Sequence, residues 1–99
     1  MNAANLQIEG VLMAMAATNR LLVAKGIVSR DEVDHALAAT EAVLTGEDRA
    51  VEELSPANRD AIAFPLRLLR IANRDDAVPD FQSLAKAVGQ EKGRYNDQQ

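Results

Sequence analysis

Four arginines between residues 59 and 74 form the densest group of side chains that could carry a function. Arg59, Arg67, Arg70 and Arg74 fall within a sector of roughly 80° when residues are spaced at about 100° on a helix. Guanidinium groups bind carboxylates and phosphates through paired hydrogen bonds, and they tolerate partial burial better than ammonium groups. The pattern therefore suggests an arginine stripe that docks an acidic protein partner, a nucleotide phosphate or RNA.

The arginine stripe could also be a solvated surface, or it could form ion pairs within the molecule. The chain has a net charge of −4, so the stripe stands out against an acidic background. Four nearby carboxylates could pair with it: Glu47, Asp48, Glu52 and Glu53. Surface ion pairs of this kind are common and individually weak, and no aromatic side chain lies beside the stripe to stack bases. Ordinary surface is the favoured interpretation, and nucleic acid is the less favoured partner.

No catalytic or metal site is predicted. His35 is the only histidine, and although Asp31 and Asp34 lie near it, no further dedicated ligands complete a metal-site pattern. The acidic run 47–53 lacks the alternating oxygen ligands and the glycine of a calcium-binding loop. Phosphate-binding, nucleophile and zinc-binding motifs are also missing from the sequence. We therefore expect no catalytic residues, no metal, no cofactor and no enzymatic activity.

The composition predicts an all-α protein of one domain. The 99 residues are 47% hydrophobic but only 3% aromatic, so the apolar mass is mostly alanine and leucine, which favour helices. The absence of cysteine excludes disulfides and fits a reducing compartment. Glu9 and Arg20 interrupt the apolar N-terminal stretch, so no membrane span or leader is expected there and the predicted location is cytoplasmic.

Four main helices are expected near residues 4–25, 30–45, 56–73 and 80–88, with a short helix or turn over 48–54. They form a small bundle over residues 1–90, followed by a polar tail, residues 91–99, that is expected to be disordered. Ser55 and Pro56 suit the start of the third helix.

Capping signals predict an N-terminal antiparallel helical hairpin. Gly26 has the position of a C′ glycine, and Ser29 with Glu32 has the spacing of a capping box. Helices joined by so few residues are usually antiparallel neighbours. Gly46 suits a second C′ position at the end of the next helix.

The helix predicted over residues 30–45 has an apolar stripe that should face the core. Val33, Leu37, Thr40 and Leu44 form this stripe, and Asp34 and Glu41 fall on the other side of the helix.

Pro65 interrupts the predicted third helix, because it cannot donate to the carbonyl of Ala61 and its ring crowds the preceding turn. A break would make Phe64 the N-cap, and phenylalanine has no side-chain acceptor for that position. The apolar face continues across the proline, so a kinked helix is favoured over two separate helices.

The predicted first helix is apolar on two sides. Its first face comprises Ile8, Val11, Leu12, Met15, Leu22 and Val23; its second comprises Leu6, Met13, Ala17 and Leu21. A helix of this kind is usually central to its fold or part of a subunit interface. We therefore expect a homodimer, and a small interaction or adaptor protein whose arginine stripe meets an acidic partner. The alternative is a regulatory nucleic-acid-binding protein that uses the same stripe.

Overall fold

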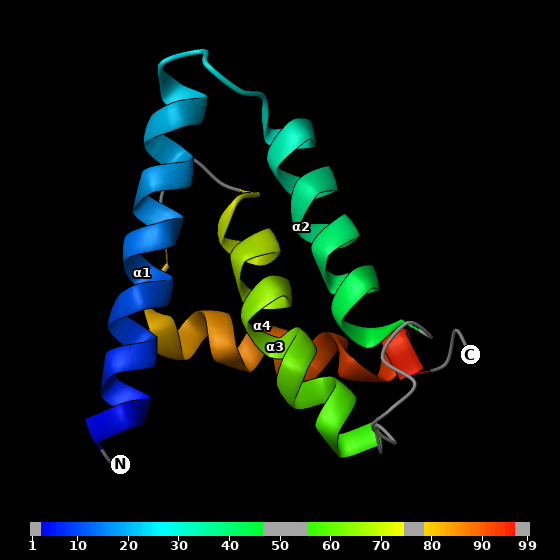
Figure 1. Cartoon of the computed structure of the whole chain (residues 1–99). Coiled ribbons are helices and arrows are strands. Elements are labelled where there is room, and N and C mark those ends of the chain that lie inside the picture. The colour runs from blue at the N-terminus through cyan, green and yellow to red at the C-terminus, as the bar shows by residue number, and fades with distance from the viewer. Residues whose placement is uncertain (1–2, 47–55, 75–78, 97–99) are drawn as a thin grey trace.

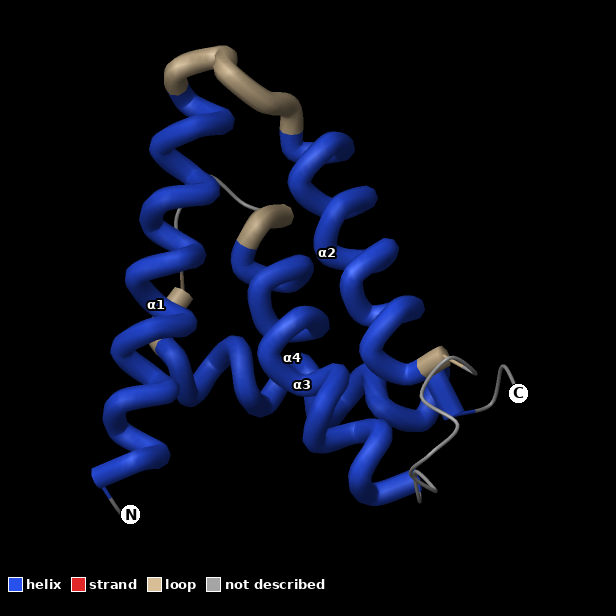
Figure 2. The backbone as a smooth tube through the Cα atoms, viewed as in Figure 1, coloured by secondary structure: helices blue, strands red, loops and turns tan. Residues whose placement is uncertain are grey.

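The computed structural model describes the backbone of residues 3–46, 56–74 and 79–96, and all of its regular structure is helical (Figures 1 and 2). In chain order the helices are α1 (Ala3–Ala24), α2 (Arg30–Thr45), α3 (Pro56–Ala72) and α4 (Phe81–Asn96). The predicted all-α fold of four main helices is confirmed. The short helix expected over 48–54, the carboxylates expected to pair with the arginine stripe, and Ser55 lie outside the described residues.

The turn between α1 and α2 forms as its residues predict. Gly26 has a φ of 73°, and the amides of Gly26 and Ile27 donate to the carbonyls of Val23 and Leu22. These two bonds make a Schellman motif, which needs a left-handed residue that glycine adopts without steric cost. The capping box follows: Glu32 N–H donates to Ser29 Oγ at 3.0 Å, and Ser29 N–H donates to Glu32 Oε1 at 2.8 Å.

The central helix is α3 rather than α1. The principal helix contacts all involve α3, which packs against α2, α4 and α1, whereas α1 and α2 have little direct contact in the described part of the chain. In Figure 1, α1 and α2 run in opposite directions from their shared turn, and they flank α3 instead of packing on each other. Since α3 takes the centre, α1 lies at one edge of the molecule.

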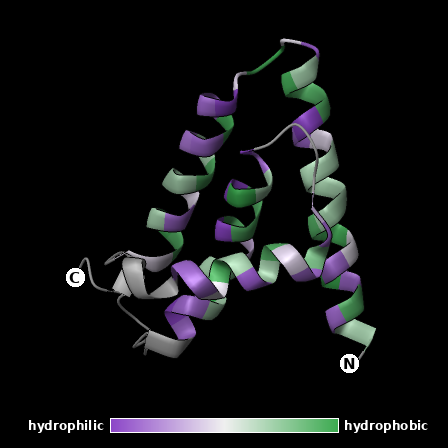
Figure 3. Cartoon of the chain, turned by 180° about the vertical axis from the view of Figure 1, so that it is seen from behind, coloured by the Kyte–Doolittle hydropathy of each residue, from purple (hydrophilic) through white to green (hydrophobic). Residues whose placement is uncertain are grey.

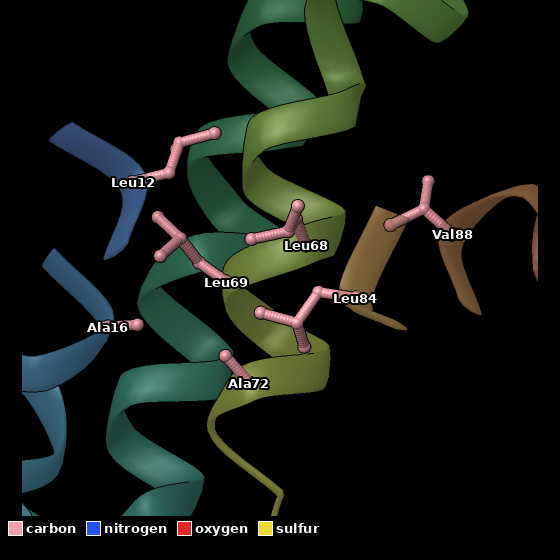
Figure 4. Close-up of a cluster of buried hydrophobic side chains, with 7 residues drawn as sticks. All are labelled: Leu12, Ala16, Leu68, Leu69, Ala72, Leu84 and Val88. Carbon is pink, nitrogen blue, oxygen red and sulfur yellow. The ribbon is translucent and has the colours of Figure 1, made fainter. Parts of the chain in front are cut away.

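The core is small and is built around α3. Leu68 is fully buried, and it joins Leu69 and Ala72 of the same helix in one cluster. Leu12 and Ala16 of α1 approach this cluster from one side, and Leu84 and Val88 of α4 approach it from another (Figure 4). The second helix has no buried residue, although Leu37 packs against the cluster. Apolar burial therefore joins α3 mainly to α1 and α4.

Pro65 lies inside α3, which runs through it without a break. Ala61, whose carbonyl Pro65 cannot bond, is exposed, and Pro65 itself is half-buried on the side of α4. The continuous helix agrees with the favoured interpretation, and the kink itself stays a prediction.

Two helix ends differ from their predictions. Gly46 has an extended backbone (φ −84°, ψ 179°), so it is not a left-handed C′ residue. Close approach explains the glycine, because a Cβ there would lie 2.6 Å from the carbonyl oxygen of Ala42. The last helix continues to Asn96 instead of ending near residue 88, since Gly89 keeps a negative φ and good helix formers follow it. The division into residues 1–90 and a tail of residues 91–99 stays a prediction.

Helix α4 begins with a capping interaction. Asp80 Oδ1 accepts a hydrogen bond of 2.8 Å from the amide of Ser83, and hydrogen bonds from the Ser83 side chain and backbone lower the pKa of the Asp80 carboxyl.

Within the described residues, none of the helices combines the length and the apolar character that crossing a bilayer requires.

Candidate functional site

Arg59, Arg67 and Arg70 of the arginine stripe lie on α3, and Arg74 lies in the turn that follows it. Arg67 is buried, with 8% of its surface exposed, Arg70 is half-buried, and Arg59 and Arg74 are exposed. The first and last arginines of the stripe are therefore exposed, whereas Arg67 and Arg70 between them lie in a helix interface. The stripe is less uniformly exposed than a solvated face would be.

Arg67 forms the most buried ion pairs of the described chain. Its Nε lies 3.1 Å from Glu41 Oε2 of α2, and its Nη1 lies 3.5 Å from Asp60 Oδ1, two turns earlier in α3. The side chains of Arg67, Glu41 and Asp60 are only 10%, 14% and 19% exposed. Glu41 Oε1 is buried without a hydrogen-bond partner among the described residues. One guanidinium thus balances two carboxylates in a place where water screens poorly.

Arg70 and Arg74 each donate two hydrogen bonds to one carboxylate. Arg70 donates to both oxygens of Asp34 in α2, at 2.9 and 3.2 Å. The Arg70 hydrogen bonds, and secondly the positive charge of that guanidinium, lower the pKa of the Asp34 carboxyl. Arg74 donates to both oxygens of Glu91 in α4, at 3.0 and 3.3 Å. Paired N–H donors facing one carboxylate are the geometry for which arginine is better suited than lysine.

Three arginines of the stripe therefore form ion pairs with carboxylates of α2 and α4. Asn73 adds a neutral contact, because its Nδ2 donates to the carbonyl of Arg30 at 3.0 Å. The carboxylates involved are not the ones expected from the sequence, which lie outside the described residues. Binding of an acidic partner by the stripe stays a prediction, and Arg59 and Arg74 are its members with the most exposed surface.

The interface of α2 includes most of the predicted apolar stripe and part of the acidic side of the helix. Val33, Leu37 and Leu44 of the stripe are half-buried as expected, whereas Thr40 is exposed. Asp34 and Glu41, which were expected on the other side of the helix, are also half-buried, because the prediction ranked positions by hydrophobicity alone. Two strong charge pairs with α3 turn the acidic side of α2 inward. A usable signal was present, since Asp34 and Glu41 are seven residues apart and share one side of a helix.

His35 is exposed on α2. Within the described ranges, no group of three or more histidine and acidic side chains is placed to hold a metal ion. Among the residues that the structure describes, no further ligand joins His35, Asp31 and Asp34.

The largest exposed apolar surface belongs to α1. Leu6, Ile8, Val11, Met15 and Leu21 are each between 46% and 58% exposed. Among the described residues, seven large apolar side chains are exposed and only six are buried. The helix is correspondingly coloured as hydrophobic along most of its length in Figure 3. Exposed apolar side chains gathered on one helix are typical of an interaction surface.

A groove of about 800 Å³ opens beside the N-terminal half of α1, between it, α3 and α4. Its lining includes Phe64 and Phe81, whose rings meet edge to face with centroids 6.3 Å apart. Ile8 and Glu9 of α1 also line the groove, as do Asp60 and Arg67 of α3, which form an ion pair with each other. The groove is large enough to accommodate apolar side chains of a docked segment.

Comparison with protein-family models, curated proteins and solved structures finds no match to this chain.

Proposed function

We propose that the chain is a small cytoplasmic interaction protein that self-associates through α1. The observation that carries this proposal is that Ile8, Val11 and Met15, on one side of α1, are 54%, 58% and 46% exposed at the edge of a molecule whose own core is small. Covering these side chains with a second protein surface would remove apolar area from water, at about 25 cal/mol per Å². The cytoplasmic location rests on the cysteine-free composition, which suits a reducing compartment.

The geometry favours α1 over the arginine stripe as the principal binding surface. An arginine that already donates to carboxylates inside the fold would have to exchange those partners to bind an external one. The apolar side chains of α1 would give up only contacts with water. Salt separates the two modes, because screening weakens contacts between exposed charges and leaves apolar contacts intact or stronger.

Sedimentation velocity of the full chain tests the proposal. At roughly 10–100 µM, a range typical of modest protein association, we expect a dimer at low salt that persists in about 1 M NaCl. A monomer throughout this concentration range would overturn self-association. A dimer that dissociates in high salt would overturn the assignment to an apolar surface.

A further inference from the structure

Three of the exposed apolar residues of α1, Ile8, Val11 and Met15, belong to a run of positions with the spacing of a coiled-coil seam. Positions 4, 8, 11, 15, 18 and 22 alternate steps of four and three residues, and they lie within about 80° of one another around the helix. They are Ala4, Ile8, Val11, Met15, Thr18 and Leu22. We call this set the α1 seam. It spans about 27 Å at 1.5 Å per residue.

The fold leaves the α1 seam uncovered. Ile8, Val11 and Met15 are 54%, 58% and 46% exposed, Ala4 and Thr18 are also exposed, and Leu22 is half-buried. The residues of α1 that enter the core, Leu12 and Ala16, lie about a quarter of a turn away around the helix. The core of the chain therefore does not account for the 3.5-residue repeat.

The α1 seam carries no charge. The two charged side chains within α1, Glu9 and Arg20, lie roughly opposite the seam on the helix. Thr18 is its only polar member, and the hydroxyl donates to the carbonyl of Ala14 at 2.9 Å. Because this donor is already satisfied within the helix, burial of Thr18 would leave no unpaired hydrogen. The whole seam can thus be buried against another uncharged helix face.

We propose that the seam packs against the same seam of a second copy, with the two α1 helices antiparallel about a two-fold axis near residue 13. This arrangement rests on the self-association proposed above and names its contact. It places Ala4 opposite Leu22 of the second copy, Ile8 opposite Thr18, and Val11 opposite Met15.

Side-chain size selects the antiparallel direction. Each pair at the ends of the antiparallel seam combines a small and a large residue, so the two helices can keep an even separation along its length. A parallel seam would place alanine against alanine at one end and leucine against leucine at the other. The opposed helix dipoles of the antiparallel pair add a further favourable term.

Disulfide cross-linking tests the register. Because the chain has no native cysteine, only the introduced thiols can form a cross-link. We expect an equimolar mixture of Ile8→Cys and Thr18→Cys chains to form a covalent heterodimer on mild oxidation. Ile8→Cys alone should form none, because two copies of residue 8 would be separated by about 15 Å along the axis, beyond disulfide reach. Both substitutions are at exposed positions, and circular dichroism verifies that each variant is folded.

Three results would overturn the antiparallel seam. Cross-linking of Ile8→Cys with itself would show a parallel contact. A protein that is dimeric by sedimentation but gives no cross-link in the mixture would retain self-association and refute the seam. A protein that stays monomeric would refute both proposals.

A charge placed in the seam gives an independent readout. Val11→Glu would bury two unpaired carboxylates per dimer, so the dissociation constant should rise on the order of a hundredfold or more. An unchanged dissociation constant would also overturn the seam.

Discussion

Removing Arg67 should cost far more stability than its single charge suggests. Arg67→Met keeps much of the apolar stem of the side chain but leaves Glu41 and Asp60 without the guanidinium that lies 3.1 and 3.5 Å from them. Breaking a buried ion pair by removing one partner costs about 3–5 kcal/mol, and the remaining 14–19% exposure of the two carboxylates favours the lower end. A loss of about 3 kcal/mol is a large part of the roughly 5–15 kcal/mol that stabilises a domain, and it corresponds to a fall in Tm of roughly 12–24 °C.

Urea unfolding followed by circular dichroism measures this loss, with all variants at one protein concentration because association contributes to stability. Arg74→Met is the control, since it removes an arginine of the same stripe, in the turn after α3, whose side chain is 52% exposed, and it should cost at most about 1 kcal/mol. Adding Glu41→Leu to Arg67→Met should restore at least about 1 kcal/mol, because one orphaned buried charge is removed. Equal losses for Arg67→Met and Arg74→Met, within about 0.5 kcal/mol, would refute the reasoning.

Three further perturbations test other parts of the fold. Leu68 is fully buried at the centre of the core, so Leu68→Ala should lower the free energy of unfolding by about 2–5 kcal/mol in the same urea titration; a loss below about 1 kcal/mol would contradict the placement of α3. Gly26 has a φ of 73°, so Gly26→Ala should cost about 1 kcal/mol, seen as a lower Tm by calorimetry, and an unchanged Tm would count against the Schellman turn. The Asp34 carboxyl has a folded pKa below its ordinary value of 3.8, so its contribution is fully present above about pH 3.8 and is lost as the pH falls through the folded pKa. The difference in unfolding free energy between wild type and Asp34→Asn should therefore shrink between about pH 6 and pH 2.5, and a constant difference would contradict the pairing with Arg70.

Local signals predicted the helix ends well where the deciding residues are close in sequence. The turn between α1 and α2 depends on Gly26, Ser29 and Glu32, which lie within six residues of one another. Their spacing in the sequence was therefore enough to predict this turn. Gly46 was misassigned because its requirement is the nearness of the Ala42 carbonyl, which depends on the path of the chain after α2. Residue type identifies a glycine but cannot distinguish a positive φ from a close contact.

Tertiary placement could be predicted less well, because helical periodicity says which side of a helix is apolar and not which neighbour covers it. The sequence indicated that α1 is apolar on two sides, and the structure shows that the core uses only Leu12 and Ala16 fully. The arginines of the stripe were recognised as a group, but their carboxylate partners Glu91, Glu41 and Asp34 are 17 to 36 residues away in the sequence. Pairing over such separations depends on the packing of α2 and α4 against α3, which no local pattern contains.

Sedimentation equilibrium of three proteins tests the central claim, that α1 carries the self-association surface. Wild type, Val11→Glu and Leu6→Glu are compared at one concentration; Val11 and Leu6 are similarly exposed, at 58% and 52%, but they lie on different sides of α1. We predict a dimer for the wild type and for Leu6→Glu, and a monomer for Val11→Glu. A Val11→Glu protein that stays dimeric, or a wild type that is monomeric, would contradict the account.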